Sequence, residues 1–227
     1  MPSSERSSGI QTGKITVALY ISVPVASFRN PYARDYLETY LVPPPSTVYG
    51  MLLSSIGEIS RWRHVGTQIS YALLKRPLVS SILRTKWRIK SERKPLGVGE
   101  NKTPDFQELL TGIEMAVRIR HGVDESVPSL AERIVNLLGL PAGINRFGAL
   151  SLGESTHMVN EFRSWKTSDG TEGIMLIPAD DGDLSLPLWA DHVNLRNVRW
   201  GRYRLEKRNL VDVPDEEAWI TIVPPNN

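Results

Sequence analysis

A run of three prolines, Pro43-Pro44-Pro45, limits the folding of this chain more strongly than any other part of its sequence. Proline fixes the backbone φ angle and lacks an N–H group, so the run excludes a helix and predicts an extended segment. The residues that follow, from about Ser46 to Ile56, have the spacing of a helix, which Ser46 or Thr47 can cap and Gly57 can end. The sequence therefore predicts an extended segment that leads abruptly into a helix.

This predicted helix has two different faces. One face carries an apolar stripe that predicts packing against the core, formed by Val48, Leu52 and Ile56. A second face is almost bare of side chains, because it presents Gly50, Ser54 and Gly57. A bare face beside the free N–H groups of a helix start lets a phosphate backbone approach closely. Taken alone, the same pattern also fits tight packing of a helix against a sheet, which is the commoner reason for it.

Positive charge is gathered in one part of the chain. The 227 residues carry a net charge of only +2, yet residues 61–102 contain eleven lysines and arginines against two glutamates. The rest of the chain is therefore net acidic. A near-neutral protein with its cations in one segment is a candidate for a polyanionic partner, although a solvated strand face can have the same composition.

The basic segment has the pattern of strands joined in a long hairpin. Residues 66–77 and 78–89 are predicted strands, and residues 113–120 alternate again between apolar and polar. In the second strand the cations recur at every other position, at Arg84, Lys86, Arg88 and Lys90. Residues 91–105 contain few apolar side chains and two glycines, which predicts a mobile tip. Together these segments predict a hairpin that projects from the body of the protein.

The remaining segments complete an α+β pattern. Residues 14–23 form a predicted buried strand, and residues 129–138 a helix with a capping box of Ser129 and Glu132. Further predicted strands follow at 170–178, 193–205 and 219–223. The order of these elements predicts a ferredoxin-like (RRM-like) βαββαβ core with a long basic β-hairpin thumb and a small β-rich C-terminal extension.

The predicted boundaries divide the chain into three parts. Residues 1–13 are rich in serine and glycine and are expected to be a disordered lead-in. Residues 14–165 form the ferredoxin-like domain, which includes the thumb hairpin at about 84–112. Residues 166–227 form the β-rich extension.

Several classes of chemistry are excluded or unsupported. The chain has no cysteine, which excludes thiolate nucleophiles and disulfides and fits a cytoplasmic location. No apolar run approaches the roughly 18 residues that a membrane-spanning helix needs. Phosphate-loop and dinucleotide fingerprints are absent, and the four histidines stand singly, so we expect no cofactor and no metal site.

Two histidines are candidates for catalysis on a nucleic acid, and three tryptophans are candidates for binding one. His121 and His157 could each act as a general base on an RNA 2′-hydroxyl, although a structural role is the commoner one for such histidines. Trp62, Trp87 and Trp200 lie beside arginines, and stacking of a base on such a ring contributes about 1–3 kcal/mol. Each ring could instead anchor a strand to the core. Trp87 is the stronger candidate because its neighbours are basic.

Three segments together resemble one family. They are residues 20–29 (YISVPVASFR), residues 43–52 (PPPSTVYGML) and residues 146–155 (RFGALSLGES). In their order and spacing, which span about two thirds of the chain, they resemble the Cas-five family of CRISPR-associated proteins. Members of this family cap the 5′ handle of the guide RNA (crRNA) in type I surveillance (Cascade) complexes, and have a ferredoxin-like domain with a hairpin thumb.

The resemblance implies a set of RNA-binding residues. The handle would be enclosed by Ser27 and Arg29, by the helix start at Ser46, Thr47, Tyr49 and Gly50, and by the glycine loop at Ser151, Gly153, Glu154 and Ser155. The thumb would reach toward a neighbouring backbone subunit and the first guide nucleotides with Arg84, Lys86, Trp87, Arg88 and Lys90.

The resemblance also implies partners and an activity. The expected partners are the crRNA 5′ handle, the backbone subunit and the large subunit of the complex, and target DNA indirectly through the complex. Most members of the family bind RNA without cutting it, so we expect no enzymatic activity. The alternative is a metal-independent endoribonuclease that processes precursor crRNA, because one branch of the family cleaves with a small Tyr/Lys/His cluster.

Overall fold

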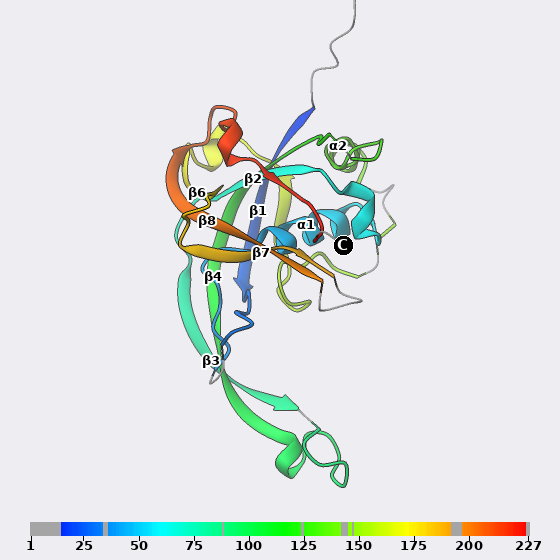
Figure 1. Ribbon diagram of the computed structural model, residues 1–227, viewed down its shortest axis with the longest axis vertical. Coiled ribbons are helices and arrows are strands. Elements are labelled where there is room, and N and C mark those ends of the chain that lie inside the picture. Colours follow the sequence, from blue (N-terminus) through cyan, green and yellow to red (C-terminus); the bar gives the residue numbers. More distant parts are fainter. Residues whose placement is uncertain are drawn as a thin grey trace, which may run out of the picture.

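The computed structural model describes residues 15–33, 36–87, 89–123, 125–141, 145–146, 148–191 and 197–225. In this part of the chain nine strands form one sheet, in the order β5-β1-β4-β2-β6-β8-β7, with β3 paired to β4 and β9 paired to β2 (Figure 1). The strands are β1 (Thr16–Ala26), β2 (Gln68–Leu73), β3 (Leu78–Trp87), β4 (Lys102–Arg120), β5 (Glu161–Ser164), β6 (Glu172–Pro178), β7 (Leu184–Ala190), β8 (Val198–Asn209) and β9 (Ile220–Thr221). Their pairings are antiparallel, which makes the protein α+β as predicted.

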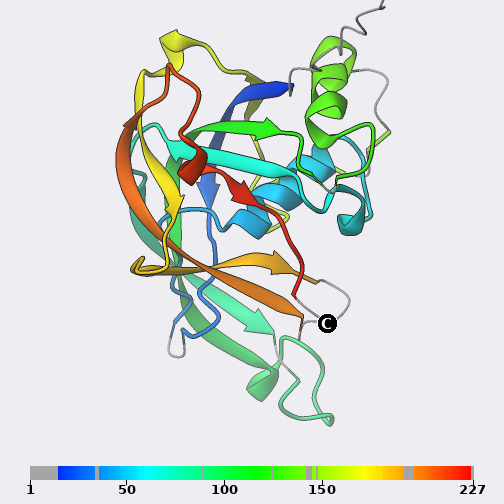
Figure 2. The ribbon, with the colours of Figure 1, turned by 45° about the horizontal axis from the view of Figure 1, so that its top comes forward.

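Two helices cover one face of this sheet. They are α1 (Pro45–Ser55) and α2 (Leu130–Gly139), and they contact one another. The sheet curves so that α2 packs on β1 and β4 while α1 also contacts β7, near the other end of the sheet (Figure 2). No helix in the described part of the chain is long and apolar enough to cross a membrane.

The core lies between the helices and the central strands β1, β4 and β2. The predicted alternation in residues 113–120 is confirmed, because four side chains of β4 are buried on the helix-covered face: Ile113, Met115, Val117 and Ile119. In β1, Leu19 and Ile21 pair with two of these positions across the antiparallel ladder. The opposite face of the sheet carries a smaller cluster that includes Ala72, Ala116 and Met175. Both faces of the central strands are therefore covered.

The start of α1 differs from the prediction. Pro45 is the first helical residue and Pro44 is the N-cap, so Ser46 and Thr47 lie inside the first turn and neither caps the helix. The Pro44 carbonyl accepts hydrogen bonds from the backbone N–H groups of Thr47 and Val48, at 2.9 and 3.1 Å. Proline suits the first helical position because it has no N–H to satisfy and its φ angle is already helical. The proline run therefore extends into the helix instead of stopping before it.

The end of α1 agrees with the prediction. Gly57 has a positive φ of 68°. The N–H groups of Gly57 and Glu58 donate to the carbonyls of Ser54 and Leu53, at 3.2 and 3.0 Å. This is the paired hydrogen bonding of a Schellman motif, in which glycine takes the left-handed position without steric cost. The predicted apolar stripe is also confirmed, since Val48, Leu52 and Ile56 are buried.

Strands β3 and β4 form a long hairpin that extends away from the body (Figure 1). Their pairing runs from Leu78 opposite Thr111 to Trp87 opposite Lys102. The predicted tip at 91–105 therefore extends too far at its C-terminal boundary, because residues 102–105 belong to β4 and pair with β3. Asn101 is buried and closes the described part of the tip, accepting from the N–H groups of Lys90 and Ser91 at 2.7 and 2.9 Å.

The capping box of α2 is confirmed. The side chain of Ser129 accepts from the N–H of Glu132 at 3.2 Å, and the Glu132 carboxylate accepts from the N–H of Ser129 at 2.6 Å. These two hydrogen bonds satisfy donors that have no partner within the helix. The sequence therefore located this helix to within one residue at each end.

The later strands were predicted less completely. The segments at 170–178 and 219–223 contain β6 and β9, and β8 begins at Val198, whereas Val193 lies outside the described residues. Strand β7 was not predicted; it contains Pro187 and lies at the edge of the sheet, where a proline is tolerated. A β-bulge between Pro187 and Trp189 accommodates this proline in the ladder. The strands of residues 166–227 join the same sheet as β2, through the β2–β6 and β2–β9 pairings.

The buried face of α1 provides a test of the fold. We expect Leu52→Ala to lower the free energy of unfolding by about 2–5 kcal/mol, because Leu52 is fully buried and its truncation leaves a cavity. Chemical denaturation followed by circular dichroism measures this change. Leu140→Ala is the matched control, since Leu140 is exposed just after α2 and its truncation should change stability little. Equal effects of the two substitutions would contradict this packing.

Candidate nucleic-acid interface

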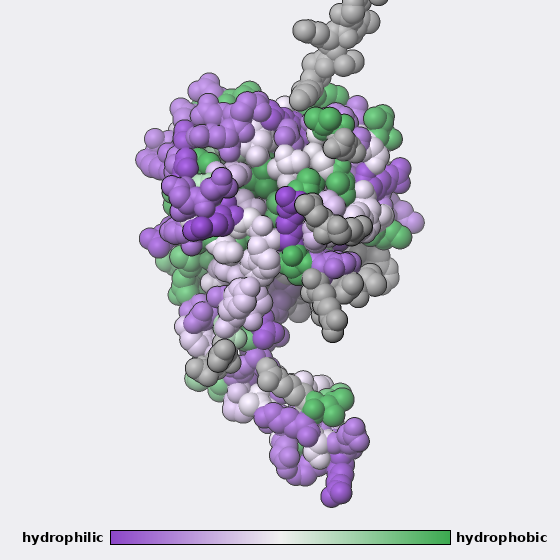
Figure 3. Space-filling view, viewed as in Figure 1, coloured by the Kyte–Doolittle hydropathy of each residue, from purple (hydrophilic) through white to green (hydrophobic). Residues whose placement is uncertain are grey.

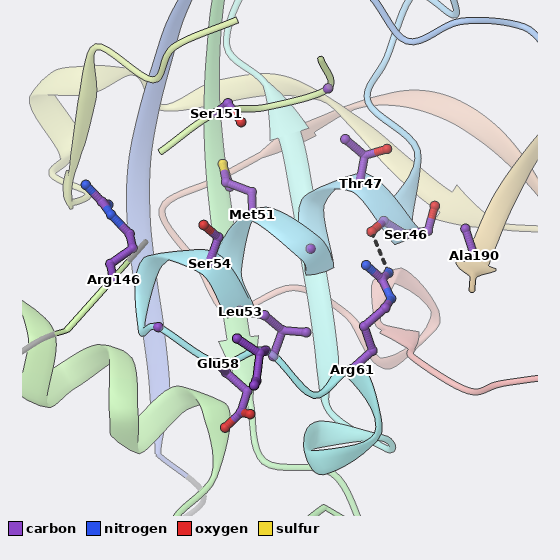
Figure 4. Close-up of a pocket in the computed structure, with 14 residues that line it drawn as sticks. Ser46, Thr47, Met51, Leu53, Ser54, Glu58, Arg61, Arg146, Ser151 and Ala190 are labelled. Carbon is purple, nitrogen blue, oxygen red and sulfur yellow. Dashed lines mark hydrogen bonds between the residues drawn. The ribbon is translucent and has the colours of Figure 1, made fainter. Parts of the chain in front are cut away.

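A pocket of about 380 Å³ lies where the first turns of α1 meet the segment after it and the glycine loop (Figure 4). Its lining is mostly small or polar, with one arginine on each side. The lining residues are Ser46, Thr47, Gly50, Met51, Leu53, Ser54, Gly57, Glu58, Ile59, Arg61, Arg146, Ser151, Gly153 and Ala190. Two of the segments singled out in the sequence, the helix start and the glycine loop, therefore meet in one place.

The bare face of α1 opens onto this pocket. Gly50, Ser54 and Gly57 all line it, so this face is not packed tightly against the sheet. Gly50 also makes room for a neighbouring cation, because a Cβ atom there would lie 3.1 Å from Nη1 of Arg61. Of the two interpretations of this face, the structure favours an accessible surface.

Arg61 forms one side of the pocket and is held from several directions. Its Nη2 group donates to the carbonyl of Ser46 at 3.0 Å, the contact drawn as a dashed line in Figure 4. Its guanidinium group lies 5.4 Å from the ring centre of Tyr49 and 5.5 Å from that of Trp189. The Tyr49 hydroxyl donates to the Arg61 carbonyl at 2.6 Å. Burial lowers the pKa of Arg61, but a guanidinium group stays charged at neutral pH.

Arg146 provides the second cation, on the opposite side of the pocket from Arg61 (Figure 4). Its side chain is exposed, and its Nε group donates to the carbonyl of Gly148 at 3.2 Å. The carboxylate of Glu58 also lines the pocket, but it pairs with Arg133 at 2.6 Å and with Arg63 at 3.3 Å. Burial opposes ionisation of Glu58, yet the hydrogen bonds from Arg133 outweigh it and lower its pKa. The pocket therefore favours an anionic ligand.

The glycine loop packs directly against the segment that follows β1. Gly153 has a positive φ of 92°, and a Cβ atom there would lie 2.8 Å from the carbonyl oxygen of Ser27. The buried Nδ1 of His157 accepts from the N–H groups of Ser27 and Glu154, at 3.2 and 3.3 Å. These contacts bring together the first and third segments of the family resemblance. His157 acts here as a connector between two backbone segments.

Glu154 ties the glycine loop to the base of the hairpin. Its carboxylate accepts from Nη1 of Arg84 at 2.9 Å and from Nε2 of Gln107 at 2.8 Å. Burial tends to raise the pKa of Glu154, but the hydrogen bonds from Arg84 and Gln107 lower it overall. Glu154 and Arg84 therefore hold the hairpin against the pocket, and part of the charge of Arg84 is already neutralised.

The other predicted contacts separate into two groups. Near the pocket, Arg29 is exposed and Ser155 lies in the glycine loop, whereas Tyr49 is fully buried. We therefore assign Tyr49 a supporting position beneath the pocket in place of a direct contact. On the outer half of the hairpin, Trp87 and Lys90 are exposed, while Lys86 forms an ion pair with Asp105. Arg88 lies outside the described residues.

The two candidate catalytic histidines lie far apart. His157 accepts a hydrogen bond from Ser27, which follows the C-terminal end of β1. His121 follows Arg120, which pairs with Thr16 at the N-terminal end of the same strand. Eleven residues of extended strand place them on the order of 30 Å apart. Nδ1 of His121 lies 3.5 Å from the buried carboxylate of Glu125. Among the described residues, no three acidic or histidine side chains gather as metal ligands.

Both arginines that line the pocket were absent from the predicted contacts. Arg61 belongs to the Arg61-Trp62-Arg63 sequence, whose arginines were noted as neighbours of the tryptophan but were not selected as contacts. Arg146 begins the glycine-rich segment but was not selected from it. Arg61 is the first residue of the basic segment 61–102 and Arg146 the first of the segment 146–155, and these positions were the available signal.

The role of His157 as a connector makes a prediction about pH. Burial lowers the pKa of His157, so the unfolded chain binds more protons than the folded chain as the pH falls below about 6.5. The contribution of this residue to stability is therefore present above that pH and is lost below it. We expect thermal melts between about pH 7 and pH 5 to show a shallower loss of stability in His157→Asn, whose amide oxygen can still accept the two N–H groups. Parallel losses in the two proteins would contradict this role.

Comparison with known proteins places these features in a family. A family model described as CRISPR-associated protein (Cas_Cas5) matches residues 16–103. The CRISPR-associated protein Cas5 of Myxococcus xanthus (strain DK1622) is 39% identical over 193 residues, which cover 84% of this chain and 90% of that protein. A solved chain titled "CRISPR RNA-guided surveillance complex" has the same fold, with a TM-score of 0.56 at 13% identity, covering 90% of this chain and 96% of that one. The chain therefore belongs to the Cas5 family of CRISPR-associated proteins.

Proposed function

We propose that this chain is an RNA-binding subunit of a CRISPR RNA-guided surveillance complex and that it holds the 5′ handle of the crRNA. The observation that carries this proposal is the pocket at the bare face of α1, which has Arg61 and Arg146 on opposite sides. The family membership and the fold shared with a chain of such a complex support the same assignment. A type I (Cascade) complex is the form of assembly that the resemblance implies.

The pocket suits a sugar-phosphate backbone. The N-terminal end of a helix carries partial positive charge, and Gly50 and Ser54 leave space for a phosphate group to approach α1. The hydroxyl groups of Thr47 and Ser151 can donate to phosphate or to a 2′-hydroxyl. A backbone held in this way presents unpaired bases outward, which is how single-stranded RNA is usually read. Ser27 and Gly153 pack against one another at one side of this pocket.

The finer architecture supports the same proposal. The order β5-β1-β4-β2, with α1 between β1 and β2 and α2 between β4 and β5, supports a ferredoxin-like core. We propose that the β3–β4 hairpin is the thumb and that it contacts a neighbouring backbone subunit. Its outer face carries exposed apolar side chains at Val79, Leu83, Trp87 and Phe106. Its far end shows both hydrophobic and hydrophilic surface (Figure 3). Contacts with the large subunit, and with target DNA through the complex, complete the proposed cytoplasmic assembly.

We propose that binding occurs without cleavage. Nδ1 of His157 already accepts two backbone N–H groups, and His121 lies at the other end of β1 beside Glu125. A metal-independent endoribonuclease needs acid and base groups positioned on the same scissile phosphate. The separation of these histidines supports the binding role over the alternative endoribonuclease.

The binding role predicts a salt-dependent interaction with RNA. We expect the protein to bind an oligoribonucleotide of the 5′ handle, with an affinity that falls as salt rises, because phosphate contacts release counterions. Arg146→Gln should weaken binding about tenfold and reduce the slope of log affinity against log salt by about one. Fluorescence anisotropy at several salt concentrations measures both quantities. Lys207→Gln is the matched control, since Lys207 is an exposed cation on β8. Equal affinity of Arg146→Gln and wild type would contradict the placement of the handle.

The absence of cleavage is tested separately. We expect precursor repeat RNA to remain intact when it is incubated with the protein in EDTA, as judged on a denaturing gel. A specific cut that disappears in His121→Ala or His157→Ala would establish the endoribonuclease alternative. A cut that persists in both variants would point to a contaminating nuclease.

A further inference from the structure

Trp62 is an exposed aromatic residue at the edge of the pocket. It lies in the 3₁₀ turn Arg61–His64, and 56% of its surface is exposed. Its ring contacts the buried Trp189, with ring centres 5.0 Å apart and planes inclined at 55°. The indole of Trp62 is thus seated on the core at one side and open to solvent over the rest of its surface. Trp62 is not among the residues that line the pocket.

The surroundings of Trp62 connect it to the pocket. Arg61, its neighbour in the chain, lines the pocket, and so does Ala190, the neighbour of Trp189. The guanidinium group of Arg61 lies over the same Trp189 ring that Trp62 contacts. A strand of RNA whose phosphate lies beside Arg61 therefore has its next base within reach of Trp62.

Hydrogen bonds fix the position of the turn that carries Trp62. His64 is fully buried and donates from Nδ1 to the Glu125 carboxylate at 3.0 Å, while its Nε2 accepts from Arg133 at 3.0 Å. The Tyr49 hydroxyl holds the other end of the turn through the Arg61 carbonyl. An aromatic ring on a fixed turn loses little conformational entropy on binding, which favours it as a contact surface.

We propose that Trp62 is a stacking platform for one unpaired nucleobase of the RNA that the pocket holds. The ring supplies a face on which any base can stack, and the neighbouring Arg61 lines the pocket proposed for the flanking phosphate, whereas Arg63 pairs with Glu58. This inference rests on the proposed handle-binding function and adds a base contact to its backbone contacts. A protein partner is a different occupant for the same surface, because Ile59 nearby is 97% exposed. The cations and the continuity with the pocket favour the nucleobase.

A matched pair of substitutions separates stacking from simple apolar contact. Trp62→Phe keeps an aromatic face, whereas Trp62→Leu keeps apolar bulk without one. We expect Trp62→Leu to weaken binding of the handle oligoribonucleotide about tenfold and Trp62→Phe to remain close to wild type. Thermal melts of both variants show whether the fold is retained. Val213→Ala, at an exposed position that does not line the pocket, should leave RNA affinity unchanged.

A second measurement uses the wild-type protein and needs no variant. Handle oligoribonucleotides that carry 2-aminopurine at one position at a time should show strong quenching on binding at the position that stacks on Trp62. An abasic site at that position should weaken binding of wild type but not of Trp62→Leu. If wild type binds the handle while no position shows this dependence on Trp62, the stacking proposal is wrong and the handle-binding function stands. Absence of any handle binding by wild type overturns both.

Discussion

The burial of α1 in the concave face of the sheet determines where the candidate contacts lie. Val48 and Leu52 pack into the core, which turns Gly50 and Ser54 outward. The sheet curves far enough that β7 contacts the same helix, bringing Trp189 and Ala190 to its side. The hydrophobic stripe of α1 thus orients its bare face, and the curvature of the sheet supplies the opposite side of the site. One packing interaction therefore forms both the core and the pocket.

Several residues near the pocket connect structural roles to the proposed RNA contacts. Arg61 is held by Ser46, Tyr49 and Trp189, so its charge is presented in a defined position. His157 joins the glycine loop to the segment after β1, and Glu154 joins that loop to Arg84 of the hairpin. The hydrogen bond between Arg84 and Glu154 joins two charged groups, and such bonds are stronger than neutral ones. The hairpin, the glycine loop and the segment after β1 are consequently linked to one another.

The histidines show how position limits the chemistry that a residue type suggests. Histidine is the side chain most often used for general acid–base catalysis. In the fold, however, His121 and His157 lie at opposite ends of β1, and each already contacts another group. The pattern of isolated histidines in the sequence could not show this separation, because it depends on the pairing of β1 with β4.

Local patterns in the sequence were enough to predict the helices, the central strands and the hairpin. The capping box of α2, the left-handed Gly57 and the alternation in residues 113–120 each depend on interactions within a few residues, and each is found in the structure. The motif segments also predicted that the helix start and the glycine loop belong to one site.

The tertiary fold decided what local patterns could not. Strand β7 contains a proline, which is tolerated because β7 lies at the edge of the sheet and a bulge interrupts its pairing with β8. Arg61 and Arg146, 85 positions apart in the sequence, line opposite sides of one pocket because the fold brings the turn after α1 and the glycine-rich segment together. Tyr49, beside Gly50 in the sequence, is buried because a helix turns successive residues to different sides. Short-range patterns record hydrogen bonding and burial along the chain, whereas a pocket is formed by long-range packing between segments whose separation no local pattern encodes.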